Sequence, residues 1–276
     1  MKKVIKALVL AATMACGVMS AQAATVNIGG LNVPTGPHFE VANILENIIT
    51  TKGQILSGVG EISQINFQPL SNFCSGCELT YSFTNYLVTA VSNTEVRFSG
   101  GLIQVYLDFG GAATDFNPSN TTNSATDFLR ATDGTLFLTL AGHPVNAAGD
   151  TFIGSGSNIG LLNPVGTGSG LLDVVRGLGL GIAQANFDTN SISSMFGSGF
   201  TDFQIGSSFS SVFVPHPSEC AGVLALTGPE CLSGSSDFRG LVVAVIPEPE
   251  SLALFGVALL GLVAFSKRRK VVDAAV

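Results

Sequence analysis

Residues 78–109 read ELTYSFTNYLVTAVSNTEVRFSGGLIQVYLDF. The stretch holds four runs that are rich in β-branched, aromatic and other apolar residues, at 78–84, 86–92, 95–99 and 101–109. Because β-branched and aromatic side chains fit the pleated, half-buried surface of a sheet, each run predicts a strand. The closely spaced runs indicate that this part of the chain is β-structure.

Similar runs lie on both sides of this stretch, and we expect strands at 54–67, 134–141, 151–159, 202–214 and 238–246. From Val41 to Thr50 the apolar residues have helical spacing but the β-branched residues favour a strand, so we expect a strand, with a short helical entry as the alternative. Gly58 and Gly60 predict a bulge or bend within 54–67. Many short strands separated by Gly- and Asn-containing turns predict an all-β fold, a single β-sandwich or jelly roll over residues 24–246. The 19 Phe and the absence of Trp suit a Phe-filled core between two sheets.

Residues 168–183 (GSGLLDVVRGLGLGIA) are the best candidate for a helix in the middle of the chain. The spacing of their apolar residues favours a helix, whereas their five glycines oppose one.

The N-terminus is typical of a secretory signal peptide over residues 1–23. Lys2, Lys3 and Lys6 precede an apolar run, and Ala21-Gln22-Ala23 forms an A-x-A cleavage site. We therefore expect export through the Sec translocon and cleavage by signal peptidase, with a mature start at Ala24.

The region between the two terminal segments is strongly acidic. It holds five Lys and Arg against 16 Asp and Glu, a net charge of −11. Binding to nucleic acid needs a basic surface, so this balance excludes that class of partner. It favours solubility and allows cation binding.

Four cysteines, Cys74, Cys77, Cys220 and Cys231, lie in the mature region. In an exported chain they favour two disulfides, and local closure favours Cys74–Cys77 with Cys220–Cys231. A four-cysteine zinc site and a redox-active C-x-x-C remain as alternatives. We expect no cofactor.

Each of the three histidines, at 38, 143 and 216, adjoins a proline, which predicts exposed turns. A metal triad would need them to meet from three distant loops.

The oxygen-rich loop 115–127 offers Asp115, Asn117 and Asp127 as weak candidate Ca²⁺ ligands. It lacks the Gly and the terminal Glu of an EF-hand loop. A loop held by its own side chain-to-backbone hydrogen bonds is the favoured interpretation, and we expect no metal.

No catalytic constellation stands out in the sequence. There is no G-x-S-x-G elbow, and nothing singles out two of the 16 carboxylates as a glycosidase pair. We expect a protein that is not an enzyme.

The C-terminal segment 247–276 has three parts. Pro247-Glu248-Pro249 is followed by an uncharged apolar run at 251–265 and by the cations Lys267, Arg268, Arg269 and Lys270. As a helix, the 15 residues of the run span roughly 22 Å, which predicts a short transmembrane helix. The cations mark its cytoplasmic end. A buried core helix is the alternative.

These three parts resemble the PEP-CTERM sorting signal of proteins exported by Gram-negative bacteria. One departure is that six residues follow the basic cluster. The resemblance implies a precursor anchored in the inner membrane and processed by an exosortase, then delivered to the outer surface or extracellular matrix.

Delivery of this kind favours a structural or adhesive role in the exopolysaccharide matrix of biofilms or flocs. The alternative is a secreted carbohydrate-binding or carbohydrate-hydrolysing β-sandwich, which predicts a cleft with Tyr81, Tyr86 or Tyr106 beside carboxylates.

Overall fold

The computed structural model describes residues 24–110, 115–121, 123–161, 163–210, 215–220 and 230–245. The predicted signal peptide 1–23 and the predicted transmembrane helix 251–265 lie outside the described residues. The described strands and helices belong to a unit that ends at Val243.

The strands are β1 Thr25–Ile28, β2 Leu31–Pro34, β3 Gly36–Glu46, β4 Ile55–Ile65, β5 Gln68–Pro69, β6 Cys77–Val91, β7 Glu95–Phe109, β8 Thr135–His143, β9 Phe152–Ser157, β10 Val165–Val174, β11 Ile192–Ser193, β12 Phe200–Thr201, β13 Phe203–Ser210 and β14 Leu232–Val242. The helices are η1 Leu70–Asn72, α2 Ser124–Ala131, α3 Gln184–Phe187 and α4 Pro217–Cys220.

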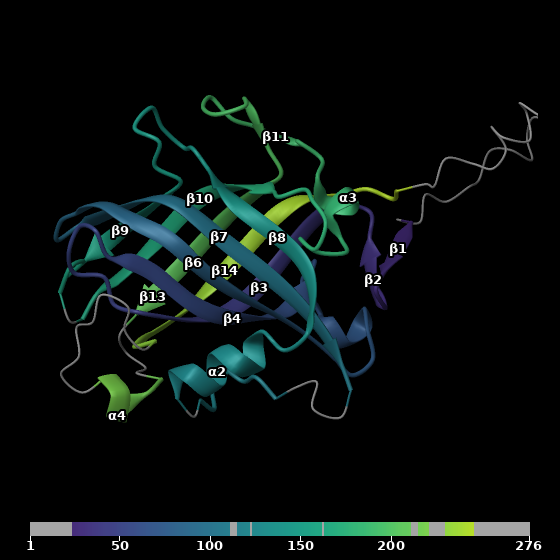
Figure 1. Cartoon of the computed structure of the whole chain (residues 1–276), viewed down its shortest axis with the longest axis horizontal. Coiled ribbons are helices and arrows are strands. Elements are labelled where there is room, and N and C mark those ends of the chain that lie inside the picture. The colour runs from purple at the N-terminus through teal and green to yellow at the C-terminus, as the bar shows by residue number, and fades with distance from the viewer. Residues whose placement is uncertain are drawn as a thin grey trace, which may run out of the picture. The chain divides into compact units, whose positions relative to one another are not determined.

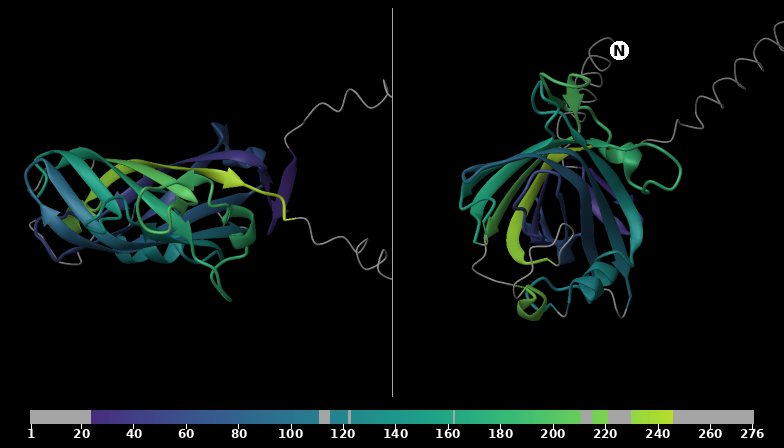
Figure 2. Two further views of the ribbon diagram at one scale, coloured as in Figure 1. Left: turned by 90° about the horizontal axis from the view of Figure 1, so that it is seen from above. Right: turned by 60° about the vertical axis from the view of Figure 1, so that its left-hand side comes forward.

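Ten of the strands form one antiparallel sheet that closes on itself (Figures 1 and 2). The long strands pair in the order β3, β4, β6, β7, β8, β10, β13 and β14. Strand β14 returns to pair with β3 along its whole length, from Leu232 opposite Glu46 to Val242 opposite Gly36. The short β5 is an addition beside β4, and β8 and β9 share one position between β7 and β10. Eight positions therefore surround an up-and-down barrel.

The all-β prediction is confirmed, but the prediction of a sandwich or jelly roll is wrong. In a sandwich, two sheets face each other, whereas here β10 pairs with β13 and β14 with β3, so the wall has no break. Alternation of buried and exposed residues is the same in both architectures, and only the pairing of the strands separates them.

Two local predictions had opposite outcomes. The strand pairing shifts register between Leu56 and Gly58, which confirms the bulge or bend expected in 54–67. The helix predicted at 168–183 is wrong, since residues up to Val174 belong to β10. Gly168 and Gly170 face the ring of Phe152, which occupies the space where their Cβ atoms would lie, so the glycines serve strand packing.

A small second core lies between the barrel wall and α2, which crosses the outside of the barrel next to β4 (Figure 1). Leu45 and Val59 point outward from the wall and pack with Phe116 and Ala131. The helix begins after Asn123, whose side-chain oxygen accepts a hydrogen bond from the N–H of Thr126 at 2.9 Å. The inward side chains of the same strands are free to form the interior.

The end of the barrel where β3 begins is filled with side chains. Phe187 of α3 packs against Phe137, Phe203 and His38, with ring centroids 6.0, 5.6 and 5.2 Å from its own. The Nε2 atom of His38 lies 2.6 Å from a carboxyl oxygen of Glu40, and both side chains are buried. We call these five residues the packed half of the interior.

Candidate functional site

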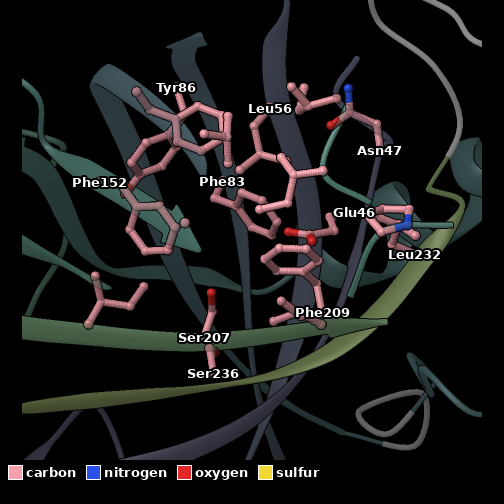
Figure 3. Close-up of a pocket in the computed structure, with 18 of the residues that line it drawn as sticks. Glu46, Asn47, Leu56, Phe83, Tyr86, Phe152, Ser207, Phe209, Leu232 and Ser236 are labelled. Atoms are coloured by element: carbon pink, nitrogen blue, oxygen red, sulfur yellow. The ribbon is translucent and has the colours of Figure 1, made fainter. Parts of the chain in front are cut away.

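The opposite end of the interior, where β3 ends, contains a cavity (Figure 3). Its volume is about 70 Å³, and it is partly open to solvent. Strands β3, β4, β6, β7, β9, β13 and β14 all contribute to its wall. We call this region the hollow half of the interior.

Aromatic rings line the wall because the strands carry glycine at matching positions. A Cβ atom on Gly60 would overlap the ring of Tyr81, and one on Gly101 would overlap the ring of Tyr86. Each ring thus fills the place of a missing side chain on the neighbouring strand. The rings therefore lie against the barrel wall, and the centre of this half of the barrel is left open.

Among the described residues that line the cavity, Glu46 is the only one with a carboxyl or a basic side chain. The other ionisable groups there are the hydroxyls of Tyr81 and Tyr86. Glu46 is 7% exposed, and its carboxyl points into the cavity (Figure 3). No hydrogen bond joins this carboxyl to a described residue. Burial raises the pKa of Glu46 to about 8, so at pH 7 the carboxyl is mostly neutral and has an O–H to donate.

Some of the other polar groups in the cavity wall form hydrogen bonds with described residues, and one buried hydroxyl does not. The hydroxyl of Tyr81 lies 2.6 Å from the hydroxyl of Ser236. Asn47 donates to the carbonyl of Ile55 and accepts from the N–H of Ser57, so each end of its amide forms a hydrogen bond. The buried hydroxyl of Tyr86 has no partner among the described residues. Burial raises the pKa of both tyrosines.

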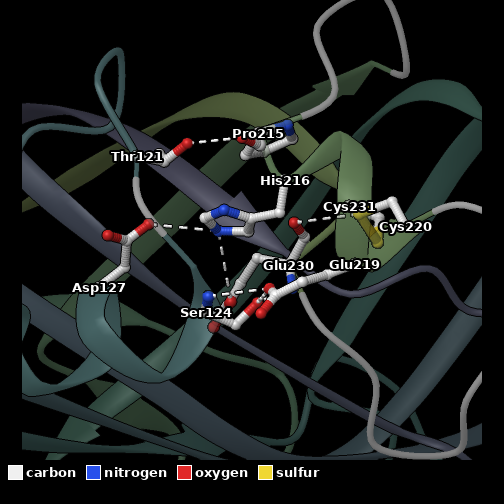
Figure 4. Close-up of a disulfide and its surroundings, with 9 residues drawn as sticks. All are labelled: Thr121, Ser124, Asp127, Pro215, His216, Glu219, Cys220, Glu230 and Cys231. Atoms are coloured by element: carbon white, nitrogen blue, oxygen red, sulfur yellow. Dashed lines mark hydrogen bonds and ion pairs between the residues drawn. A yellow bond between two sulfur atoms is a disulfide. The ribbon is translucent and has the colours of Figure 1, made fainter.

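A disulfide fixes the chain beside this cavity (Figure 4). Cys220 ends α4 and is bonded to Cys231, whose N–H donates to the backbone oxygen of Glu46 at 2.8 Å. The disulfide therefore connects α4 to the strand ends that carry Glu46.

A buried polar cluster attaches α4 to the outer helix α2. The Nε2 atom of His216 lies 3.2 Å from a carboxyl oxygen of Asp127 and 3.9 Å from one of Glu230. Glu219 accepts hydrogen bonds from the N–H and the hydroxyl of Ser124, and the backbone bond holds the pKa of Glu219 below its usual value. Burial raises the pKa of Glu230. These contacts link elements that lie far apart in sequence.

The sorting residues predicted at Pro247, Glu248 and Pro249, and the basic cluster Lys267–Lys270, lie outside the described residues. Residues 245–270 match the family model of the PEP-CTERM protein-sorting motif. The chain carries a PEP-CTERM sorting motif. This confirms the resemblance and indicates an exported precursor that an exosortase processes. None of the curated proteins matches the chain.

Within the described part of this PEP-CTERM protein, no helix has both the length and the apolar character needed to cross a membrane.

Both favoured disulfides of the PEP-CTERM protein are present, Cys74 with Cys77 and Cys220 with Cys231. The pairing leaves none of the four thiols free to bind zinc, whereas a redox-active C-x-x-C would contain the same Cys74–Cys77 bond in its oxidised form.

The three weak Ca²⁺ candidates face different partners. Asp115 lies 3.8 Å from Arg130, Asn117 accepts a hydrogen bond from the N–H of Ser119, and Asp127 contacts the histidine described above. The Asn117 contact is of the side chain-to-backbone kind expected for this loop. Among the described residues, no group of three or more His, Cys, Asp or Glu side chains is placed to hold a metal ion.

The expectation that the three histidines are exposed is wrong. His38, His143 and His216 are each no more than 2% exposed. His38 lies inside a strand, and the ring nitrogens of His143 contact a carboxyl oxygen of Asp173 and the backbone oxygen of Phe196, both at 2.8 Å. His216 contacts Asp127 of α2, so the three imidazoles are buried at three separate places.

The cavity itself was not predicted from the sequence. The expected cleft named Tyr81, Tyr86 and Tyr106, of which the first two line the cavity beside Glu46. Tyr106 does not line it, because residues 103, 105 and 107 of β7 take the inward positions. Glu46 lies an even number of residues after Ala42 and Ile44, so it shares their face of β3. This period of two could have identified Glu46 as an inward-facing residue.

Proposed function

We propose that this PEP-CTERM protein is a non-enzymatic structural or adhesive component of the cell surface or of an exopolysaccharide matrix. The observation that carries the proposal is the match of residues 245–270 to the sorting motif. In this proposal the chain enters the Sec translocon, signal peptidase removes residues 1–23, and the tail anchors the precursor in the inner membrane through 251–265. The exosortase then releases the barrel to the outside.

Two features support a role outside the cytoplasm. Disulfides persist in oxidising compartments, and both pairs are formed. The excess of carboxylates between the terminal segments suits a hydrated extracellular environment and multivalent contact with a polymer matrix.

The proposal is tested by measuring the intact mass of the protein in each fraction of its host. We expect the surface or medium fraction to hold a form that lacks residues 1–23 and most of the chain after Pro247. Replacing Pro247, Glu248 and Pro249 by alanine should retain the precursor in the inner membrane.

The matched control replaces Val271 and Val272, which lie beyond the motif, and should leave release unchanged. Release of the triple-alanine variant at the normal level would contradict the proposed sorting.

Carbohydrate binding or hydrolysis is the second candidate, and the presence of Tyr81 and Tyr86 beside Glu46 in one cavity favours it. Two arguments rank it lower. A sugar carries many hydroxyl groups, which a mostly apolar wall would leave without partners. Glycoside hydrolysis ordinarily uses two carboxyl groups, and the described lining offers Glu46 alone. Hydrolysis of any member of a polysaccharide panel by the mature protein would overturn the non-enzymatic role.

A further inference from the structure

The hollow half has the properties of a ligand site. An unfilled apolar cavity destabilises a protein by about 24 cal/mol per Å³, and a buried carboxyl without a partner adds to this cost. The packed half of the same barrel shows that the fold can fill its interior with phenylalanine. The cavity is therefore caused by the residues at this end of the strands and not by the barrel fold itself.

Ordered water does not account well for this space. A buried water typically makes about three hydrogen bonds, and a site needs several polar partners to hold one. Here the amide of Asn47 already forms two hydrogen bonds, and the hydroxyls of Tyr81 and Ser236 bond each other. Glu46 can anchor one polar atom, but most of the surrounding wall is apolar.

The same groups define the chemistry of the occupant. No Lys, Arg or His is present among the described lining residues, so an anionic group would enter without a counter-charge. The protonated carboxyl of Glu46 donates an O–H and therefore matches a hydrogen-bond acceptor. The rest of the occupant faces rings such as Phe83 and Phe152 and aliphatic side chains such as Leu56.

We propose that the hollow half of the barrel binds a small, uncharged, apolar molecule with one hydrogen-bond acceptor, such as a ketone or an ester, and places that acceptor at Glu46. This binding activity goes beyond the proposed matrix role, and neither depends on the other. A failure of sorting would leave it intact, and a failure of binding would leave sorting intact.

The test uses the processed protein recovered from its host and the uncharged fluorescent ketone 6-propionyl-2-dimethylaminonaphthalene. We expect saturable binding with a blue-shifted emission. We also expect competition by 2-nonanone and none by glucose. Absence of saturable binding, or displacement by glucose as effective as by 2-nonanone, would overturn the proposal without the use of any variant.

Two adjacent serines of β13 provide matched variants. Ser207 lines the cavity, whereas Ser208 bonds Ser235 on the other face of the strand. Ser207→Phe should weaken binding of the ketone at least about tenfold, whereas Ser208→Phe should bind as the wild type does. Circular dichroism confirms that each variant is folded. Equal affinities of the two folded variants would overturn the placement of the ligand.

The role of Glu46 is tested with a pair of probes. Glu46→Leu should weaken binding of the ketone about tenfold and leave the affinity for 2-propylnaphthalene, which has no acceptor, unchanged or increased. Glu46→Gln keeps a donor and should retain most of the ketone affinity. If Glu46→Leu binds the ketone as tightly as the wild type, the acceptor is not placed at Glu46.

Discussion

The packed and hollow halves of the barrel interior contain the same kind of residue in different settings. Glu40 and Glu46 lie six residues apart on the inward face of β3, and they are 8% and 7% exposed. Glu40 has His38 as a partner at 2.6 Å, whereas Glu46 faces the cavity and has no described partner. One strand therefore holds a carboxyl that supports the fold and another whose hydrogen-bonding capacity is unused.

Burial alone therefore does not define the role of an acidic residue. In the packed half, α3 inserts Phe187 among the strands, and a hydrogen bond joins the polar pair beneath it. In the hollow half, glycines and rings share the wall, and the centre is left open. Changes that disturb one half should therefore differ in size or sign from matched changes in the other.

The largest difference is expected for phenylalanine truncation. Phe187→Ala removes a ring that is 1% exposed and surrounded by others, and should lower the free energy of unfolding by about 4 kcal/mol. Phe83→Ala removes a ring that already borders the cavity, and should lower it by about 2 kcal/mol. Urea unfolding of both variants measures the difference. Equal losses would mean that the two halves are packed alike.

Removal of the histidine partner should have the next largest effect. His38→Ala leaves Glu40 buried without its hydrogen bond, and we expect a loss of about 3 kcal/mol at pH 7. Glu40→Gln retains a hydrogen-bonding side chain and should cost about 1 kcal/mol. Urea unfolding again provides the readout, and similar small losses in both variants would show that the pair does not stabilise the packed half.

The raised pKa of Glu46 predicts a pH dependence of stability. The folded pKa of about 8 lies above the unfolded value of 4.5, so the folded state holds the extra proton between these pH values. The stability contributed by the neutral carboxyl is complete below pH 4.5 and is lost as the pH rises toward 8. Integrated between the two pKa values, this linkage amounts to about 5 kcal/mol.

The measurement compares Glu46→Gln with the wild type from pH 5 to pH 8. The variant should gain in relative stability as the pH rises. Glu78 is a useful control, since burial also raises its pKa to about 8 but the residue lies outside the cavity. Glu78→Gln should remove its own share of the pH dependence and leave binding of the fluorescent ketone unchanged. A pH-independent difference between Glu46→Gln and the wild type would contradict the assigned pKa.

The smallest effects are expected for the tyrosine hydroxyls, and they should differ in sign. Tyr81→Phe loses the hydrogen bond to Ser236 and should destabilise the fold by about 1 kcal/mol. Tyr86→Phe removes a buried hydroxyl without a described partner, and should be neutral or stabilise by up to about 1 kcal/mol. Tyr106→Phe, outside the cavity, is the control, with a change within about 0.5 kcal/mol. Thermal unfolding resolves the order, and a destabilised Tyr86→Phe would point to a partner for that hydroxyl.

The strands could be predicted from the sequence because their signals are local. Runs such as 101–109 carry their own alternation of residues, and the sorting motif is a continuous segment. Closure of the barrel could not be predicted, since it depends on the pairing of Gly36–Glu46 with Leu232–Val242. The cavity escaped prediction for the same reason, because the overlap of Gly60 with the ring of Tyr81 is defined only after the strands are paired.

The pairing of β14 with β3 has a consequence for the order of events during synthesis. A chain emerges from its N-terminus, so β3 is made early and has one unpaired edge until residues 232–242 arrive. The partner strand comes almost last, and residues that match the sorting motif begin at 245, three residues after Val242. Such a distant pairing makes closure a slow, late step. The barrel therefore closes when residues 245–270 have already emerged, so the closed barrel carries its processing signal from the start.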